Sequence, residues 1–310
     1  MTGTSPASFI NNGEFIKDTA DTITTMNIPF INNGSIKVAA GELIFPQGIE
    51  NGTDVAFDLG DGTLDPGDTL TLAEGDSLVG SGMLSANLVN DGTVSPGASP
   101  GIIFVDGDYT QQANGVLEIE LGGTNAGSGF DQVDVNGAAT LDGVLNVSLL
   151  DDFKPEAGNE FLILPYTSRS GEFTSPNLPE EYNWDLEYGI SGLTLTRLAG
   201  GSISGTVSCN STHTVFVDLY VDEASPPPEV SLQISCNESY SFDDLPDGAY
   251  YVGAWIDLNE SGGGPPDEGE PTAWYGEPSE VTIIDGETRE NIDITIEEGG
   301  YHIFLPLIIR

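Results

Sequence analysis

The densest group of carboxylates in the sequence lies between residues 257 and 271, which read DLNESGGGPPDEGEP. Hard cations such as Ca²⁺ take oxygen ligands from carboxylates, amide side chains and carbonyls, on a loop in which glycine allows a sharp turn. Asp257, Asn259 and Ser261 occupy positions 1, 3 and 5 of such a loop, and Gly262 occupies position 6. This spacing predicts a calcium site. A solvated acidic hairpin loop, in which Gly and Pro only turn the chain, is the alternative that stays open.

The two cysteines, Cys209 and Cys236, both occur in the tripeptide Ser-Cys-Asn within the last third of the chain. Neither has a basic neighbour that would lower its pKa, and no further Cys or His pair accompanies them as metal ligands. Two free thiols and one disulfide are both open, and we favour the disulfide. It would close a loop of 27 residues (236 − 209) and stabilise the fold by roughly 3–4 kcal/mol.

Residues that could catalyse a reaction are scarce. The two histidines, His213 and His302, belong to no metal-binding pair. Polysaccharide lyases need a basic proton abstractor, and the first 198 residues contain few candidates. Glycosidases need two carboxylates, but pairs such as Asp106/Asp108 are also ordinary turn residues. We therefore predict no catalytic residues and no enzyme.

Charge excludes several classes of partner. The 310 residues include 7 Lys+Arg and 50 Asp+Glu, for a formal net charge of -43. A surface this negative repels nucleic acid and anionic lipid, whereas it suits divalent cations or a saline habitat. No apolar run is long enough to span a bilayer. Met1–Pro6 lacks the features of a signal peptide. We expect a secreted or cell-surface protein, so its leader would not be part of this chain, and the chain is a candidate fragment.

Short alternating runs dominate the sequence, and Asn-Gly, Asp-Gly and Pro-Gly separate them. Apolar and polar residues alternate in Leu117–Leu121, and the aliphatic residues of Val215–Val221 alternate with residues that include Asp218, which is the period of a half-buried strand. The fold class expected is all-β. Phe9-Ile-Asn-Asn-Gly returns as Phe30-Ile-Asn-Asn-Gly after 21 residues (30 − 9), with weaker echoes around Asn51, Asn90 and Asn136. A repeat of this length favours a β-solenoid over separate hairpins, for which Asn-Gly is also a common turn.

A series of motifs follows this repeat in a fixed order: NDGTVSPGASPG (90–101), VDGDYT (105–110), GVLEIELG (115–122), FDQVDV (130–135) and ATLDGVLNV (139–147). The series resembles the autotransporter-passenger-like β-helical repeat regions of bacterial surface proteins, over about residues 7–198. The resemblance implies a right-handed parallel β-helix in an exported protein that is often adhesive or structural.

Three later segments, ISGTV (203–207), YSFDDLPDGAYYV (240–252) and VTIIDG (281–286), resemble the carboxypeptidase-regulatory-like, prealbumin-like β-sandwich over about residues 202–298. That family implies a small antiparallel β-sandwich, usually a non-catalytic spacer. Its loop reads D-x-N-x-N-G-x-x-D-x-G-E-P, so the resemblance assigns Asp267 and Glu270 to the metal beside Asp257 and Asn259, with a two-residue insertion between Gly262 and Pro266.

We therefore expect a β-solenoid over 1–198, a glycine linker over 199–201, a β-sandwich over 202–298 and a hydrophobic tail over 299–310. The tail is either a final edge strand or a signal for secretion or surface attachment.

The function expected is that of a non-enzymatic exported bacterial cell-surface or extracellular-matrix protein, structural or adhesive, stabilised by Ca²⁺ and a disulfide. Its expected partners are polysaccharide, other surface proteins or further copies of itself, and not nucleic acid. A β-helical carbohydrate-active enzyme fragment is one alternative. A carbohydrate-binding module is the other, and it would use Trp184, Trp255, Trp274 and Tyr275 as exposed stacking surfaces, although core packing is their commoner use.

Overall fold

The computed structural model describes residues 7–221, 227–262 and 266–297. All regular structure in these residues is β-strand, and the predicted all-β class is confirmed. The chain divides into two compact units. The first contains the residues up to Pro179 and Trp184–Arg197, and the second contains Glu180–Asn183 and the residues from Leu198 on. The expected tail over 299–310 lies outside the described residues.

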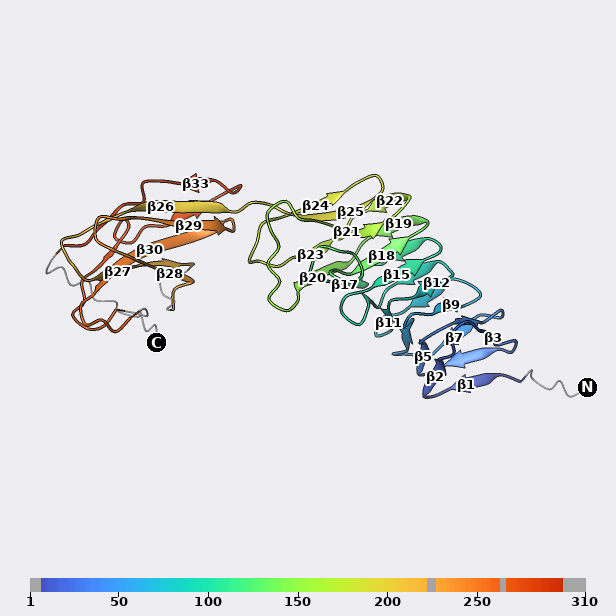
Figure 1. Ribbon diagram of the computed structural model, residues 1–310. Coiled ribbons are helices and arrows are strands. Elements are labelled where there is room, and N and C mark those ends of the chain that lie inside the picture. The colour runs from blue at the N-terminus through green and yellow to red at the C-terminus, as the bar shows by residue number, and fades with distance from the viewer. Residues whose placement is uncertain (1–6, 222–226, 263–265, 298–310) are drawn as a thin grey trace, which may run out of the picture. The chain divides into compact units, whose positions relative to one another are not determined.

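Parallel sheets build most of the first unit, and consecutive strands of each sheet are three elements apart in the chain (Figure 1). The longest sheet, with eight strands, contains β2 (Glu14–Lys17), β5 (Ser35–Val38), β8 (Ala56–Asp58), β11 (Ser77–Gly80), β14 (Thr93–Pro96), β17 (Val116–Leu121), β20 (Val144–Leu149) and β23 (Ser175–Asn177). The six-stranded sheet contains β3 (Ile23–Thr25), β6 (Glu42–Ile44), β9 (Thr63–Asp65), β12 (Met83–Leu84), β15 (Ile102–Val105) and β18 (Gln132–Val135).

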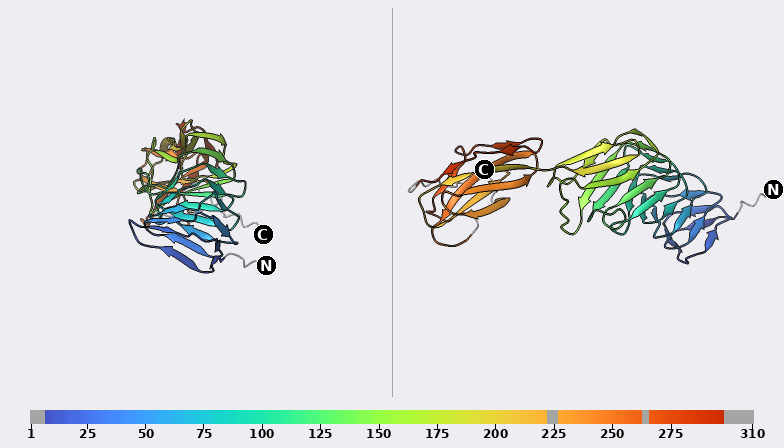
Figure 2. Two further views of the ribbon diagram at one scale, coloured as in Figure 1. Left: turned by 90° about the vertical axis from the view of Figure 1, so that its right-hand side faces the viewer. Right: turned by 45° about the horizontal axis from the view of Figure 1, so that its top comes forward.

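Two shorter parallel sheets complete this arrangement, and Figure 2 shows the strands lying side by side. One contains β1 (Phe9–Asn11), β4 (Phe30–Asn32) and β7 (Ile49–Asn51). The other contains β10 (Leu70–Leu72), β13 (Leu88–Asn90), β16 (Tyr109–Gln111), β19 (Ala138–Leu141) and β22 (Ser168–Gly171).

The 21-residue repeat predicted from the sequence sets which residues of strands β1 and β4 are paired. Phe9 pairs with Phe30, and Asn11 pairs with Asn32, in the parallel ladder of β1 and β4. The Asn11 side chain donates a hydrogen bond of 2.8 Å to the Asn32 side chain. Repeated residues of these two strands therefore lie directly above one another.

Inward-facing positions of the eight-stranded sheet form one buried apolar column. In-register pairing joins its members from β5 to β20, and each is at most 1% exposed: Ile36, Phe57, Leu78, Val94, Leu117 and Leu145. The outward-facing residues next to them on the same strands are mostly polar. The alternation in the sequence therefore separates a buried apolar interior from a solvent-exposed polar surface.

Glycine allows the turns of successive repeats to touch. A Cβ placed on Gly34 would lie 2.1 Å from the carbonyl oxygen of Gly13, one repeat earlier. Only hydrogen fits there without displacing the backbone, which explains glycine at position 34 of the second Asn-Gly dipeptide.

The last part of the first unit departs from the expected continuous solenoid. β21 (Glu160–Pro165), β25 (Gly192–Arg197) and β24 (Trp184–Tyr188) form an antiparallel three-stranded sheet. The prediction of a parallel repeat up to residue 198 is therefore wrong for these strands. β24 and β25 are joined by a three-residue connection, which is long enough for a hairpin but too short for a parallel crossover.

Two sheets enclose the core of the second unit. One contains β29 (Ser239–Leu245), β26 (Gly201–Ser208), β33 (Thr288–Arg289) and β34 (Ile294–Thr295). The other contains β28 (Val230–Ile234), β27 (Thr214–Tyr220), β30 (Gly248–Asp257), β31 (Thr272–Trp274) and β32 (Val281–Ile283). Both sheets contribute side chains to one apolar cluster, among them Ile203, Val217, Phe242 and Val252.

Two details of this unit differ from expectation. β26 pairs in parallel with β33 and β34, so the strands are mixed and not purely antiparallel. Gly200 and Gly201 are not a free linker: Gly200 N–H donates to the Asp244 carboxylate at 3.0 Å, and Gly201 begins β26. Gly201 is buried, and a Cβ there would meet the Glu287 carbonyl oxygen at 2.4 Å, so glycine serves close packing and not flexibility.

The Leu-Pro-Asp-Gly motif has a clear structural role. The Asp247 carboxylate accepts hydrogen bonds from the N–H groups of Asp285 (2.6 Å) and Gly286 (2.9 Å) and from the Asn183 side chain (3.0 Å). These donors favour the charged form and hold the pKa of Asp247 below its usual range, with the Gly286 bond the largest cause. The motif therefore fastens the turn before β30 to the turn after β32.

Candidate functional site

The predicted metal residues come together in the connection between β30 and β31. Asp257 ends β30, and Glu270 lies two residues before β31. Both carboxylates are buried, at 3% and 6% exposure. Asn259 Nδ2 donates to Asp267 Oδ2 at 2.8 Å. The structure thus places all four residues, Asp257, Asn259, Asp267 and Glu270, in one hydrogen-bonded loop.

Backbone groups of the same loop already occupy the two buried carboxylates. Ser261 N–H and Gly262 N–H donate to Asp257 at 3.1 and 2.9 Å. Leu258 N–H and Asp267 N–H donate to Glu270 at 2.9 and 2.8 Å. These bonds satisfy carboxylates that would otherwise be costly to bury, and they give the loop a defined conformation.

Within residues 7–221, 227–262 and 266–297, no group of three or more His, Cys, Asp or Glu side chains could hold a metal ion. Each oxygen of Asp257 and Glu270 accepts one backbone N–H group. Calcium binding stays a prediction from the sequence.

A thermal melt tests that prediction directly. Ca²⁺ at millimolar concentration, compared with chelator, raises the melting midpoint of the wild-type chain if the folded loop binds the ion, by linkage. Asp257→Asn should lose the shift, whereas Asp293→Asn, an acid outside the loop, should keep it. Equal midpoints with Ca²⁺ and chelator would show that the loop is held by its own hydrogen bonds alone.

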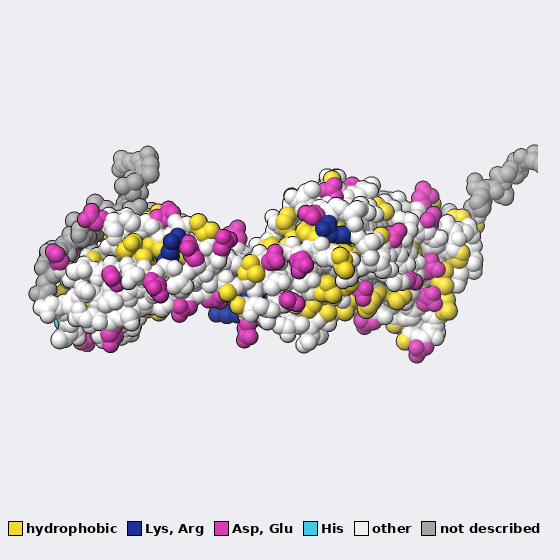
Figure 3. All heavy atoms as spheres, turned by 90° about the horizontal axis from the view of Figure 1, so that it is seen from above, with side chains coloured by type: hydrophobic (Ala, Val, Ile, Leu, Met, Phe, Trp, Pro, Cys, Tyr) yellow, Lys and Arg dark blue, Asp and Glu magenta, His cyan; other side chains and the backbone are white. Residues whose placement is uncertain are grey.

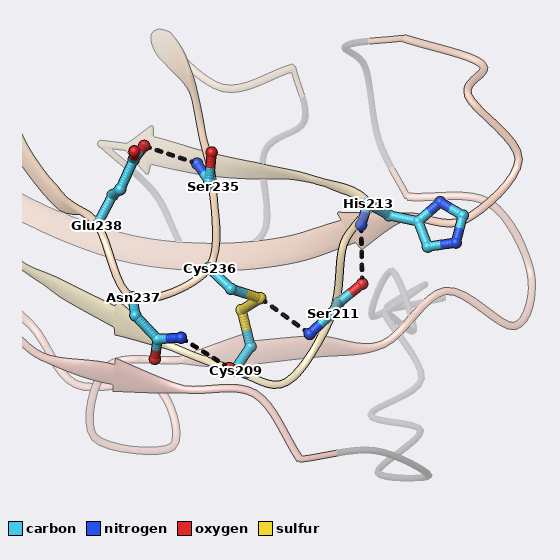
Figure 4. Close-up of a disulfide and its surroundings, with 7 residues drawn as sticks. All are labelled: Cys209, Ser211, His213, Ser235, Cys236, Asn237 and Glu238. Carbon is cyan, nitrogen blue, oxygen red and sulfur yellow. Dashed lines mark hydrogen bonds between the residues drawn. A yellow bond between two sulfur atoms is a disulfide. The ribbon is translucent and has the colours of Figure 1, made fainter.

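The predicted disulfide is confirmed: Cys209 and Cys236 are bonded, with 5.2 Å between their Cα atoms (Figure 4). Cys209 follows β26 directly and Cys236 lies two residues after β28, so the bond joins the two sheets of the second unit. Ser211 N–H points at Cys236 Sγ at 3.3 Å, and Asn237 Nδ2 donates to the Cys209 carbonyl at 3.2 Å.

His213 gives no support for catalysis. Its backbone N–H donates to Ser211 Oγ at 3.1 Å, and Figure 4 shows its ring pointing away from the disulfide and from the other labelled side chains. Asp106 and Asp108 join their turn to that of the next repeat, since they accept hydrogen bonds from Asn136 Nδ2 (2.9 Å) and Ala138 N–H (2.8 Å).

The tryptophans proposed as stacking surfaces are used mainly in packing. Trp255 is 1% exposed and stacks on Phe216, with ring centroids 4.7 Å apart. Trp184 packs against the core of the first unit, and its Nε1 donates to the Pro179 carbonyl at 2.9 Å. Tyr275 packs against the core of the second unit. Trp274 lies 5.3 Å from Tyr220, centroid to centroid.

Sequence reasoning missed a buried polar centre beside Trp255. Asp218 is 1% exposed and accepts hydrogen bonds from Trp255 Nε1 (2.9 Å), Ser231 Oγ (2.6 Å) and Tyr220 OH (3.2 Å). Burial raises the pKa of Asp218, and the three donors oppose that shift. From the alternation in β27, Asp218 was expected on the strand face that points away from the core and toward solvent. The sequence therefore gave no sign that Asp218 is buried.

A second missed carboxylate joins strand β17 to the segment that precedes β15 in the first unit. Asp131 is fully buried, and its two oxygens accept hydrogen bonds from Gly101 N–H (2.7 Å) and Glu120 N–H (2.9 Å). Burial raises the pKa of Asp131 to about 7, against the opposing effect of the two N–H donors.

We expect this group to make the stability of the first unit depend on pH. Because its folded pKa lies above its unfolded value, its contribution is fully present below about pH 4 and is lost as pH rises to about 7. The free energy of unfolding, measured in urea from pH 4 to 8, should fall more steeply with pH for wild type than for Asp131→Asn. The difference between the two slopes should be at most about 1.4 kcal/mol per pH unit. Parallel curves for the two proteins would contradict this prediction.

The described residues contain no helix that is long and apolar enough to cross a membrane. In comparisons with known proteins, no family model and no curated protein matches this chain.

Proposed function

We propose that this chain is a non-enzymatic, exported structural or adhesive protein of a bacterial cell surface or extracellular matrix. In this proposal the first unit is a right-handed parallel β-solenoid that acts as a stiff element, and the second is a spacer or anchor module. Polysaccharide and other surface proteins are the partners proposed.

The observation that carries the proposal is the continuous in-register ladder of the eight-stranded sheet, with its column of buried side chains from Ile36 to Leu145. Each strand between β2 and β23 is hydrogen-bonded to strands one repeat away on both sides, so a load along the stack is shared by many backbone bonds. Such a regular scaffold suits a structural role, in which the protein acts through its shape and not through a reaction.

Surface chemistry supports the same role. Figure 3 shows acidic side chains spread over the visible face, with few Lys or Arg. Outward-facing side chains of neighbouring strands bond one another, as in Asn177 to Asn146 (2.7 Å) and Asn146 to Glu118 (2.8 Å). Polar groups that satisfy each other in this way stabilise the surface and are not arranged around a reacting atom.

The disulfide supports the location proposed, because such bonds persist in oxidising compartments. Brief protease treatment of intact cells that make the chain, followed by mass spectrometry, should release its peptides along with known surface proteins. Peptides that appear only after lysis would overturn the location. The purified protein should also leave a panel of acidic and neutral polysaccharides undegraded. Cleavage of a polysaccharide that is abolished by one Asp→Asn substitution in the protein would overturn the non-enzymatic role.

A further inference from the structure

Strand β28 forms one edge of the five-stranded sheet of the second unit. It pairs with β27 on one side, from Val230 opposite Leu219 to Ile234 opposite Val215, and with no described strand on the other. Alternate residues of such a strand point their N–H and C=O groups away from the sheet, where another strand can pair with them.

Proteins usually protect long edge strands with charged side chains, proline or a cover. Among the described residues, four edge strands have five or more residues: β21, β24, β28 and β29. Three of them carry acidic side chains, namely Glu160 in β21, Asp185 and Glu187 in β24, and Asp243 and Asp244 in β29. β28 carries none, and the whole stretch 230–237 is uncharged in a chain of net charge -43.

The sequence of β28, Val-Ser-Leu-Gln-Ile, has the same pattern of aliphatic and neutral polar residues in both directions. An antiparallel pair centred on Leu232 places Val230 opposite Ile234 and Ser231 opposite Gln233 of the second strand. Aliphatic residues thus meet aliphatic residues on one face, and neutral polar residues meet on the other. Such self-complementarity is what a two-fold interface requires.

The aliphatic face of β28 is incompletely covered. Val230 is 41% exposed, and Leu232 and Ile234 are partly exposed. Their partners on β27, Leu219, Val217 and Val215, are at most 1% exposed. A second strand at this edge would therefore remove apolar surface from water, in addition to pairing backbone groups.

We propose that β28 is a dimerisation edge, where a second copy of this chain pairs its own β28 antiparallel about a two-fold axis at Leu232. The two five-stranded sheets then join into one sheet across the pair. Acidic surfaces elsewhere on the two copies repel each other, so salt strengthens the dimer by screening that repulsion.

This inference deepens the proposed function, because it names another copy of the chain as one partner. The two can fail separately. A monomer in solution would leave a surface location standing, and a chain found only inside cells would leave the pairing standing.

Sedimentation velocity on the full chain, over a range of concentrations at low and high NaCl, tests the dimer. We expect a monomer–dimer equilibrium that shifts toward dimer with concentration and with salt. Gln233→Glu places an added negative charge in each copy at the paired edges, and it should weaken dimerisation about tenfold, equivalent to about 1.4 kcal/mol. Ser241→Glu, an exposed position on the edge strand β29, is the matched control and should change nothing.

A wild-type chain that stays monomeric at every concentration and salt would overturn the proposal, as would a dimer that Gln233→Glu leaves unchanged. Equal melting midpoints for the two variants and wild type, measured at a concentration where all three are monomeric, establish that folding is intact.

Cysteine cross-linking tests the register independently. The native cysteines are bonded to each other, so no native free thiol competes with an added one. Under mild oxidation, Leu232→Cys should give a covalent dimer on a non-reducing gel, whereas Val230→Cys and Ile234→Cys should cross-link when mixed and not alone. Cross-linking of Val230→Cys with itself would contradict the axis at Leu232.

Discussion

Replacing both Cys209 and Cys236 with serine is expected to lower the free energy of unfolding of the second unit by about 3–4 kcal/mol. The bond closes a loop of 27 residues that includes β27 and β28, so its loss gives the unfolded chain much more conformational freedom. It also releases the connection between the two sheets near Ser211 and Asn237. Urea unfolding followed by tryptophan fluorescence should show the midpoint of this unit falling while that of the first unit stays unchanged.

The control for this experiment is Ser208→Ala with Ser235→Ala, two substitutions beside the cysteines that leave the bond intact. Reduction of the wild-type chain by dithiothreitol should reproduce the effect of the serine variant. A loss smaller than about 1 kcal/mol would mean that the two sheets are held by their core alone, and the bond would then have little effect on stability.

The second large effect is expected at Trp255. Trp255→Ala should lower the free energy of unfolding of the second unit by about 3–5 kcal/mol, because it empties a fully buried site and removes the stack on Phe216. The substitution also removes the indole N–H of Trp255, which is one of the three hydrogen-bond donors to the buried Asp218 carboxylate. Chemical denaturation monitored by circular dichroism measures the change.

Trp255→Phe separates the two contributions, since it keeps an aromatic ring but removes the indole N–H. We expect it to cost about 1–2 kcal/mol, less than the alanine variant. If Trp255→Ala instead left stability unchanged and abolished binding to a polysaccharide, Trp255 would be a ligand contact, and the carbohydrate-binding alternative would be favoured.

The sequence predicted the strands well where two signals coincided. In the first unit the alternation of apolar and polar residues predicted the strands and the 21-residue repeat predicted their register, so Phe9 and Phe30 pair as expected. The antiparallel strands β21, β24 and β25 were missed because an alternating segment looks the same in parallel and antiparallel sheets.

The buried carboxylates show what a single sequence cannot reveal. Asp131 and Asp218 look like ordinary surface acids among 50, and only the folded chain shows which N–H, O–H or indole donors surround them. By contrast, Asp257 and Glu270 were correctly grouped in one loop, because short-range spacing along the chain sets that proximity.

The three-element offset between paired strands of the first unit has a consequence for how the chain folds. Each new parallel contact closes a segment of about one repeat, as between Phe9 and Phe30, however many repeats are already in place. The entropy lost per closure therefore stays nearly constant along the stack, since it depends on the length of the closed segment. Folding can advance one repeat at a time from any completed section, as it does in other repeat architectures. A chain that crosses a membrane unfolded could then begin to fold before its far end has emerged.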